Sequence, residues 1–294
     1  MSNSTYHDTI AAAPSAPGSL SLRRIGHHAV TAMLFLGGLV MVFPFIWMIS
    51  SSLKPKSEIF GSNFSLWPRE FYGFINYGKV LFDQPYLLYI ANSLIVCLGI
   101  LLVQLATAIP AAYALAKLRF KGSSILFGAV IAGITIPVNV TAIPLYVGIV
   151  KVGLLDTYLA MMFPFFVSVF AIFLFRQFFR SFPDSIIQAA RIDGFSEMEI
   201  VIRLILPSAV PAMAAFTIFS FVSHWNDLYW PLIVVQSQDK ITATLSMMQY
   251  KGDLGIDYGV TFAAATIVTA PLVVAFLFAR RHFIRGITMT GVKG

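Results

Sequence analysis

Charged residues and cysteine are both scarce in this sequence. Only 11% of the 294 residues are Asp, Glu, Lys or Arg, against about 25% in ordinary soluble domains, while 58% are hydrophobic. So little polar surface cannot cover one or two domains in water, and the large apolar fraction excludes a chain that is disordered throughout. The single Cys97 excludes a disulfide scaffold. The composition therefore predicts a protein that lies in a lipid bilayer.

The motifs of common catalytic and nucleotide-binding sites are absent as well. The sequence has no G-x-x-x-x-G-K-[ST], H-E-x-x-H, G-x-S-x-G or C-x-x-C pattern. Of five histidines, only His224 lies well inside a predicted span, and His282 lies one residue from the end of another, which argues against haem held between membrane histidines. We expect no catalytic residue, cofactor site or metal site in this chain. An energy-driven activity would need another chain.

Six stretches are long and apolar enough to cross a bilayer as helices. Such a helix needs roughly 20 residues, because in hydrocarbon each backbone amide must be hydrogen-bonded within its own segment. The six are Val30–Ser50, Tyr86–Ala116, Ser124–Val150, Thr157–Phe179, Ser208–Val235 and Val260–Phe283. The predicted fold class is all-α, a polytopic membrane protein formed by residues 26–294. Residues 1–25, rich in Ser, Ala and Pro, are expected to form a disordered tail.

The distribution of basic residues predicts the orientation. With six spans, the N-terminal flank, the second and fourth loops and the C-terminal tail share one side, and they carry 13 of the 20 lysines and arginines. The other side carries seven, balanced by seven acids. Since basic residues concentrate on the cytoplasmic side, we expect both termini in the cytoplasm. The net charge of +7 thus reports orientation, and no nucleic-acid partner is expected.

The segment between the fourth and fifth spans, residues 181–207, carries helix signals. Pro183 suits the first turn of a helix that ends at Gly194, which can adopt the left-handed cap. Ser196 and Glu199 form a capping box that opens a second helix, in which Glu199 can pair with Arg203. This helix has an apolar face and a proline expected to end it: Ile200, Leu204, Ile205 and Pro207.

Such a rigid helix pair suits docking to a partner, and Ala189 and Ala190 are small enough for its close approach. A helix that merely completes the fourth span along the membrane surface is the alternative. A DNA-binding pair is disfavoured, because the segment is tethered at both ends and its four acids would repel phosphate.

The same segment resembles a family signature. Gln188-Ala189-Ala190, Gly194 and Leu204-Ile205-Leu206-Pro207 match the spacing E-A-A-x3-G-x9-I-x-L-P of permease subunits in binding-protein-dependent ABC importers. Gln188 replaces the Glu and Leu204 the Ile, so a role that needs the charge of that Glu does not carry over. Further stretches resemble the carbohydrate, maltose-type branch: 113–116, 120–122, 143–146, 176–179, 189–194, 225–227, 230–231 and 291–294.

The resemblance implies three contact regions. The loop would dock as a coupling helix into an ATPase subunit through Gln188, Ala189, Ala190, Arg191, Asp193, Gly194, Glu197, Leu206 and Pro207. The tail, with Gly291, Lys293 and Gly294, resembles tails that reach the ATPase. The loop 236–259, with Gln249, Tyr250 and Lys251, would probe a binding protein, although a plain connector is the alternative.

Polar side chains in or near the spans are candidates for a solute path: Asn92, Gln104, Asn139, Trp225, Asn226 and Asp227. Asn226 and Asp227 can bond sugar hydroxyls, with Trp225 offering an apolar face. They can instead cap the helix break before Pro231, and amides in spans commonly bond neighbouring helices. Their presence without a membrane-embedded Lys or Arg favours a neutral, hydroxyl-rich solute over an ion.

Together these features predict the permease subunit of a type I ABC importer in the bacterial inner membrane. It would move a sugar, oligosaccharide, polyol or related glycoside by alternating access, and it would not itself be an enzyme. The expected partners are a second homologous permease subunit, two copies of an ATPase that binds ATP and Mg, and a periplasmic solute-binding protein. The alternatives are an ion-coupled secondary transporter without an ATPase, and a structural or sensory membrane protein that carries no solute.

Overall fold

The computed structural model describes residues 18–61, 64–249, 251–252 and 255–290, with side chains described between 28 and 277 except at 62–63, 138 and 249–255. The chain divides into two compact units, Met1–Ile49 and Ser50–Gly294. The first contains most of helix α1, Gly18–Ser52. Residues 18–25, predicted to be disordered, are therefore helical, because the apolar run of the first span extends its helix toward the N-terminus. Residues 1–17 lie outside the described part.

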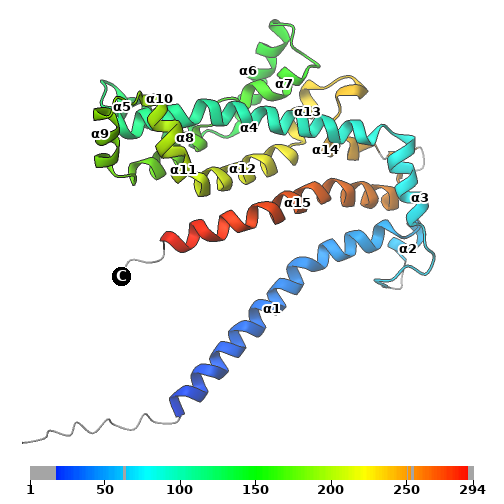
Figure 1. Ribbon diagram of the computed structural model, residues 1–294. Helices are drawn as coiled ribbons and strands as arrows, with labels where there is room; N and C mark the ends of the chain where they lie inside the picture. Colours follow the sequence, from blue (N-terminus) through cyan, green and yellow to red (C-terminus); the bar gives the residue numbers. More distant parts are fainter. Residues whose placement is uncertain (1–17, 62–63, 250, 253–254, 291–294) are drawn as a thin grey trace, which may run out of the picture. The chain divides into compact units, whose positions relative to one another are not determined.

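The second unit is almost entirely helical in its described residues. Helix α4 runs along its middle, α8 and α12 pack against α4, and α15 packs against α12 (Figure 1). The helices are α2 Lys56–Ile59, α3 Gly73–Gly78, η1 Lys79–Asp83, α4 Tyr86–Lys117, α5 Ser123–Thr135, α6 Val138–Lys151, α7 Tyr158–Met162, η2 Phe163–Phe165, α8 Val169–Arg180, α9 Asp184–Ile192, α10 Glu197–Ile200, η3 Val201–Ile205, α11 Leu206–Ser208, α12 Val210–Trp225, α13 Tyr229–Val234, η4 Gln238–Lys240, α14 Ala243–Ser246, η5 Met247–Gln249 and α15 Tyr258–Thr290. Two short strands, β1 Lys251–Gly252 and β2 Gly255–Ile256, pair antiparallel.

The spans agree with the sequence prediction in number when bent helices are counted as pairs. Three described helices are long and apolar enough to cross a bilayer unbroken, and three bent pairs raise the count to six. The bends are 102° between α5 and α6, 44° before α8, and 82° before α12. The predicted third, fourth and fifth spans each contain a break, and the break in the fifth lies before Pro231, where one interpretation of Asn226 and Asp227 expected it.

The breaks have local causes. Ile136 is held extended by the following Pro137, whose missing N–H starts α6 at no cost in hydrogen bonds. Ser168 ends the preceding turn and caps α8 by accepting a hydrogen bond from Ala171 N. In the fifth region, α12 stops at Trp225 and α13 resumes at Tyr229, so the predicted span Ser208–Val235 is two helices.

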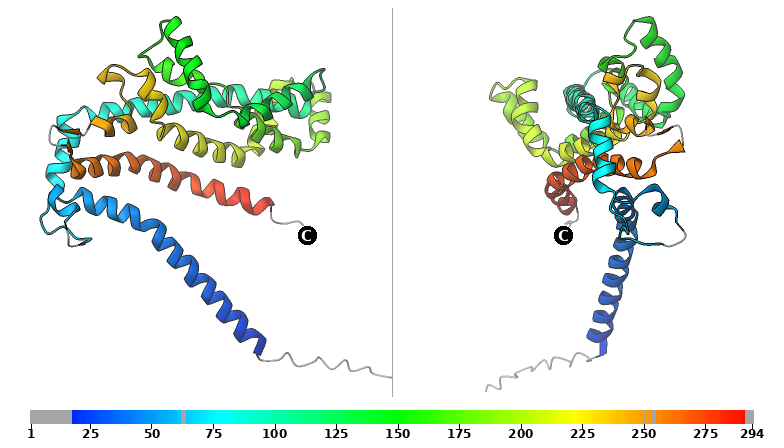
Figure 2. Two further views of the ribbon diagram at one scale, coloured as in Figure 1. Left: turned by 180° about the vertical axis from the view of Figure 1, so that it is seen from behind. Right: turned by 90° about the vertical axis from the view of Figure 1, so that its right-hand side faces the viewer.

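Two groups of short helices lie at opposite ends of α4. Helices α9 to α11 lie beside its C-terminal end, whereas α3, α14 and the start of α15 lie near its N-terminal end (Figure 2). Buried apolar side chains form separate clusters at the two ends and beneath α7 and α13. The cluster nearest α9 to α11 and a cavity halfway along α4 form the candidate functional region.

Candidate functional sites at the elbow and in a cavity

Residues 181–208, which we call the elbow, fold as the predicted helix pair. Gly194 has φ of +86°, and Phe195 N donates to Ala190 O at 3.0 Å across this turn. The capping box is present: Ser196 Oγ accepts from Glu199 N, and Ser196 N donates to Glu199 Oε2. Arg203 pairs with Glu199 at 3.3 Å. The turn and the second helix start are therefore fixed by their own hydrogen bonds.

Both prolines of the elbow differ from the prediction. Pro183 is the N-cap of α9 and not its first-turn residue. Pro207 does not end the second helix, which continues through α11 to Ser208. Leu206 N donates to Val201 O, five residues back, so η3 is a wide π turn. This widening accommodates the Pro207 ring, which in a regular α-helix would clash with the carbonyl four residues earlier.

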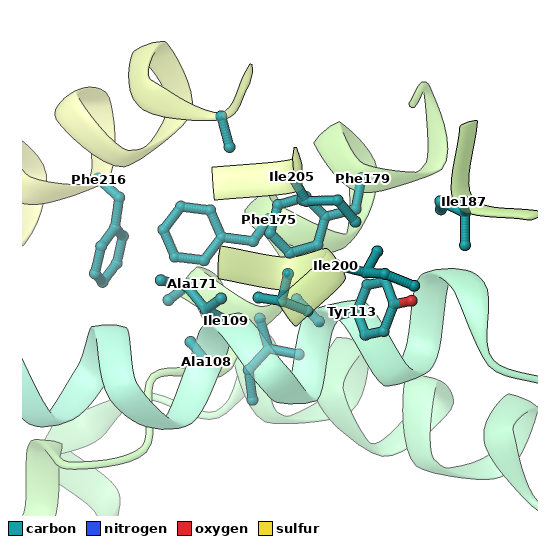
Figure 3. Close-up of a cluster of buried hydrophobic side chains, with 14 of the residues drawn as sticks. Ala108, Ile109, Tyr113, Ala171, Phe175, Phe179, Ile187, Ile200, Ile205 and Phe216 are labelled. Atoms are coloured by element: carbon teal, nitrogen blue, oxygen red, sulfur yellow. The ribbon is translucent and has the colours of Figure 1, made fainter. Parts of the chain in front are cut away.

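The inner face of the elbow is packed against α4, α8 and α12. Ile187, Ile200 and Ile205 are at most 2% exposed and lie with Phe175 and Tyr113 in one cluster (Figure 3). Ala190 also belongs to this cluster and is 6% exposed, so the prediction that it is open to a partner was wrong. The outer face presents Gln188, Ala189, Arg191, Asp193 and Gly194 together with the exposed apolar side chains of Ile186, Ile192, Met198 and Ile202.

Glu197 connects three parts of this region. Its Oε1 accepts from Arg191 Nε at 2.7 Å, and its Oε2 accepts from Arg191 Nη2 at 3.2 Å and from the Tyr113 hydroxyl. The hydrogen bonds from Arg191 lower the pKa of the Glu197 carboxyl, partial burial opposes this, and the bond from Tyr113 adds to the lowering. Glu197 and Arg191, predicted to face a partner, are therefore bonded within this chain.

A second connection joins α4 to the start of the elbow. The Lys117 side chain is only 5% exposed, and its Nζ donates to Phe182 O at 2.6 Å and to Asp184 Oδ1 at 2.5 Å. These interactions lower the pKa of the Asp184 carboxyl. In α8, Arg176 Nε donates to Leu115 O at 3.1 Å, and its guanidinium lies over the Phe127 ring. From the sequence, these basic residues counted only toward the predicted orientation.

A cavity of about 450 Å³ lies between α4, α6, α8, α12 and α13. It brings together three of the predicted path residues, Gln104, Asn139 and Asp227. The described lining includes hydroxyl groups and aromatic rings, and among those residues there is no lysine or arginine: Thr141, Ser168, Ser220, Ser223, Tyr229, Phe165, Phe219 and Trp230 contribute. The arrangement suits a neutral solute with hydroxyl groups and apolar faces.

Gln104 is the centre of the polar network in this cavity. Its Oε1 accepts from Ser220 Oγ at 2.6 Å, its Nε2 donates to Phe165 O at 2.9 Å, and the His224 Nε2 lies 3.4 Å away. Ser220 and His224 were not among the residues predicted to line the solute path. Their spacing at i and i+4 places them on one face of α12, and Asp227 follows just beyond the end of that helix. This spacing could have identified them.

The other three residues predicted for the solute path do not line this cavity. The described residues that line the cavity do not include Asn92, Trp225 or Asn226. Asn92 is fully buried, and its Nδ2 donates to Asp239 O and Ile241 O at 2.9 and 2.8 Å. Trp225 is 1% exposed and donates to Val268 O, and Asn226 Nδ2 bonds Val222 O in the preceding turn. The polar groups of Asn92 and Trp225 are used inside the protein because burial requires partners, whereas the exposed Asn226 amide bonds its own helix.

The remaining predicted contact residues lie largely outside the described part. Tyr250, Gly291, Lys293 and Gly294 are not described. Gln249 ends η5 and Lys251 begins β1, and their side chains are not described. In the part of the chain that the structure describes, no three His, Cys, Asp or Glu side chains gather closely enough to hold a metal ion.

We expect Asp227→Ala to lower stability more than it changes solute preference. Asp227 Oδ1 accepts from Trp230 N at 3.3 Å at the start of α13, and loss of such a cap costs about 0.5–2 kcal/mol. Thermal unfolding of the purified protein should show the loss, and Asp227→Asn, which keeps an acceptor, should restore most of it. A changed order of competing solutes with normal stability would contradict this assignment.

Bent apolar helices around a cavity lined by aromatic rings and a few polar groups, with a fixed elbow beside one end of the central helix, define a helical membrane protein with a candidate solute site. The comparisons give its family. The chain belongs to the binding-protein-dependent transport system inner membrane components, whose family model matches residues 104–289. These residues include the elbow and the whole cavity lining. The chain is a permease of this family, as the resemblance predicted.

Several proteins similar to this chain are permeases. The chain is 32% identical over 270 residues to the arabinooligosaccharides transport system permease protein AraQ of Bacillus subtilis, covering 90% of this chain and 95% of the relative. It is 33% identical over 255 residues to the diacetylchitobiose uptake system permease protein NgcG of Streptomyces coelicolor, covering 85% and 84%. A crystal structure of a bacterial ABC transporter that imports alginate contains a chain with the same fold, with a TM-score of 0.79, 24% identity, and 92% and 99% coverage.

Proposed function

We propose that this chain is one permease subunit of an ATP-driven importer that moves a sugar, oligosaccharide, polyol or related glycoside by alternating access. The observation that carries the proposal is the family match over residues 104–289, because that range contains both the elbow and the cavity. The cavity supplies a place for the solute, and the elbow supplies a rigid surface on which a motor subunit can act.

The proposed assembly lies in the bacterial inner membrane, with both termini and the elbow in the cytoplasm. The excess of basic residues on that side supports this orientation. Two ATPase subunits with ATP and Mg would contact the elbow, whose exposed Ile186, Ile192, Met198 and Ile202 form an apolar surface suited to burial by a protein partner. A second permease subunit would complete the path, and a periplasmic binding protein would deliver the solute.

The proposed solute class follows from the cavity. Hydroxyl, amide and imidazole groups converge there beside aromatic rings, and the described lining provides a carboxylate but no cation to balance an anionic solute. The relatives' names, which refer to arabinooligosaccharides and diacetylchitobiose, agree with a carbohydrate. We therefore expect neutral glycosides to be preferred over acidic ones.

Uptake into proteoliposomes tests this function. The complex is expressed with its neighbouring transport genes, purified through a tag on this chain, and reconstituted with radiolabelled neutral oligosaccharides outside, together with the binding protein. We expect uptake only when Mg-ATP is supplied to the ATPase side, and none with an ATPase variant that cannot hydrolyse ATP. Uptake driven by a sodium or proton gradient without ATP would contradict the proposal and support an ion-coupled transporter.

A further inference from the structure

The elbow is attached to the rest of the permease at more points than the chain connections require. The elbow follows α8 directly at residue 181, and Ala209 alone separates it from α12, where the helix direction changes by 82°. Two further connections, made by side chains, attach the elbow to α4, which is distant in sequence. One is Glu197 with Arg191 and Tyr113, and the other is Lys117 with Phe182 O and Asp184. We call these two connections the α4 clamp.

We propose, building on the proposed function, that the α4 clamp makes α4 a direct recipient of the elbow's motion and transmits that motion to Gln104 in the cavity. Glu197, Tyr113 and Lys117 are then positioning residues for transport. A helix pair held only at a one-residue joint such as Ala209 can turn about that joint. A pair also held to α4 at both ends of α9 must carry α4 with it.

The geometry of the clamp supports rigid transmission. Glu197 uses both carboxylate oxygens, so Arg191 of α9 and Tyr113 of α4 are fixed to the same group. Lys117 is almost completely buried, and its ammonium is satisfied by the backbone and side chain at the start of α9. The Arg191–Glu197 pair is itself 39% and 44% exposed, so the fixed geometry of the clamp comes from one carboxylate bonding both α4 and α9 and from the burial of the Lys117 side chain.

Helix α4 also has the continuity that transmission needs. Tyr113 and Gln104 are nine residues apart in one helix, a distance of about 14 Å at a rise of 1.5 Å per residue. Pro110 lies between them, but Ala108, Ile109 and Ala112 are buried in the cluster shared with α8 and hold α4 there. Gln104 then contacts Ser220 of α12 and the carbonyl of Phe165. Displacement of α4 therefore changes the cavity network directly.

Coupling measurements test the proposal. In Glu197→Gln one carboxylate oxygen becomes an NH2 group, which cannot accept a hydrogen bond from Arg191 or Tyr113. Tyr113→Phe removes the hydroxyl that donates to Glu197 and keeps the aromatic ring. Glu199→Gln is the matched control, because it removes the same charge two residues away, keeps a capping-box side chain, and belongs to a pair that does not involve α4. In proteoliposomes we expect the ratio of solute moved to ATP hydrolysed to fall at least about fivefold in each clamp variant. The double mutant should show the same ratio as the single variants, because both remove the same connection. The control should stay at the wild-type ratio.

A distance measurement tests the rigid connection itself. Spin labels on Arg119→Cys, just beyond α4, and Ser208→Cys, an exposed position at the end of the elbow outside the proposed ATPase contact, report the separation of α4 and the elbow. The native Cys97 is buried and is replaced by serine. We expect one distance in both the ATP-bound and nucleotide-free wild-type complex, and a second population in the Tyr113→Phe complex. A wild-type distance that changes with nucleotide, or clamp variants with a normal ratio, would overturn the proposal.

Failure of this inference is distinguishable from failure of the proposed function. If wild-type protein moves no glycoside with ATP, the function is wrong. If wild-type protein transports and the clamp variants do so with the wild-type ratio, the function stands and α4 is not a recipient. Size-exclusion profiles that match wild type exclude a general folding defect in the variants.

Discussion

Gly194→Val is expected to separate ATP hydrolysis from transport while leaving the spans folded. The residue lies at φ of +86°, where a side chain strains the backbone, and no atom lies within 4 Å of the added Cβ. Valine is therefore penalised by conformation and not by a clash, at a cost of about 1–2 kcal/mol that is relieved by opening the turn. An opened turn would bend under load, so reconstituted complex should hydrolyse ATP and accumulate much less than a tenth of the wild-type solute.

A graded series isolates the cause. Gly194→Asn should retain most transport, because asparagine tolerates the left-handed region, and Gly194→Ala should fall between asparagine and valine. Gly148→Val in α6 is the matched control, since its Cβ also meets no atom within 4 Å but its backbone is helical. If Gly194→Val transported as well as Gly148→Val, the fixed turn would have no part in coupling.

Asn92→Ala is expected to cause the largest loss of stability among the polar side chains of the predicted path. The side chain is fully buried, donates to the carbonyls of Asp239 and Ile241, and accepts from the Tyr158 hydroxyl at 2.6 Å. Alanine leaves these partners buried without their bonds, at about 1–3 kcal/mol for an unsatisfied group. The apparent melting temperature of the complex in detergent should fall by several degrees.

The control for Asn92 is another asparagine from the same list. Asn226→Ala removes an exposed amide that bonds only Val222 O in its own turn, so its effect should stay within about 0.5 kcal/mol. A normal melting temperature for Asn92→Ala, combined with an altered order of competing solutes, would restore Asn92 to the solute path.

Features set by neighbours in sequence could be predicted. The capping box at Ser196, the left-handed turn at Gly194 and the Glu199–Arg203 pair all depend on spacings of three or four residues, and all three were confirmed. Pro207 was misread because a proline signal assumes regular α geometry. The π turn before it depends on buried Val201 and Ile205, which are held by the surrounding cluster.

Features that depend on partners distant in sequence could not be predicted. Tyr113 and Glu197 are 84 residues apart, and Lys117 and Asp184 are 67 apart, so no local pattern joins them. For the same reason, only some of the residues predicted for the solute path line the cavity. Gln104 and Asn92 are both amides on the same apolar helix, but one faces a cavity and the other faces a returning loop. Sequence identified them as buried polar groups and did not distinguish their surroundings.

The π turn η3 also determines how the residues after it are rotated about the helix axis relative to α10. A π turn, closed by a hydrogen bond five residues back, contains one residue more than an α turn. Val201–Ile205 therefore changes the rotation about the helix axis between the capped start of α10 and the residues that follow. Each residue of an α-helix advances the azimuth by about 100°. The length of this stretch therefore sets the direction of the residues that follow it, and one residue gained or lost there would rotate Leu206–Ser208 by about 100° relative to the capped start of α10.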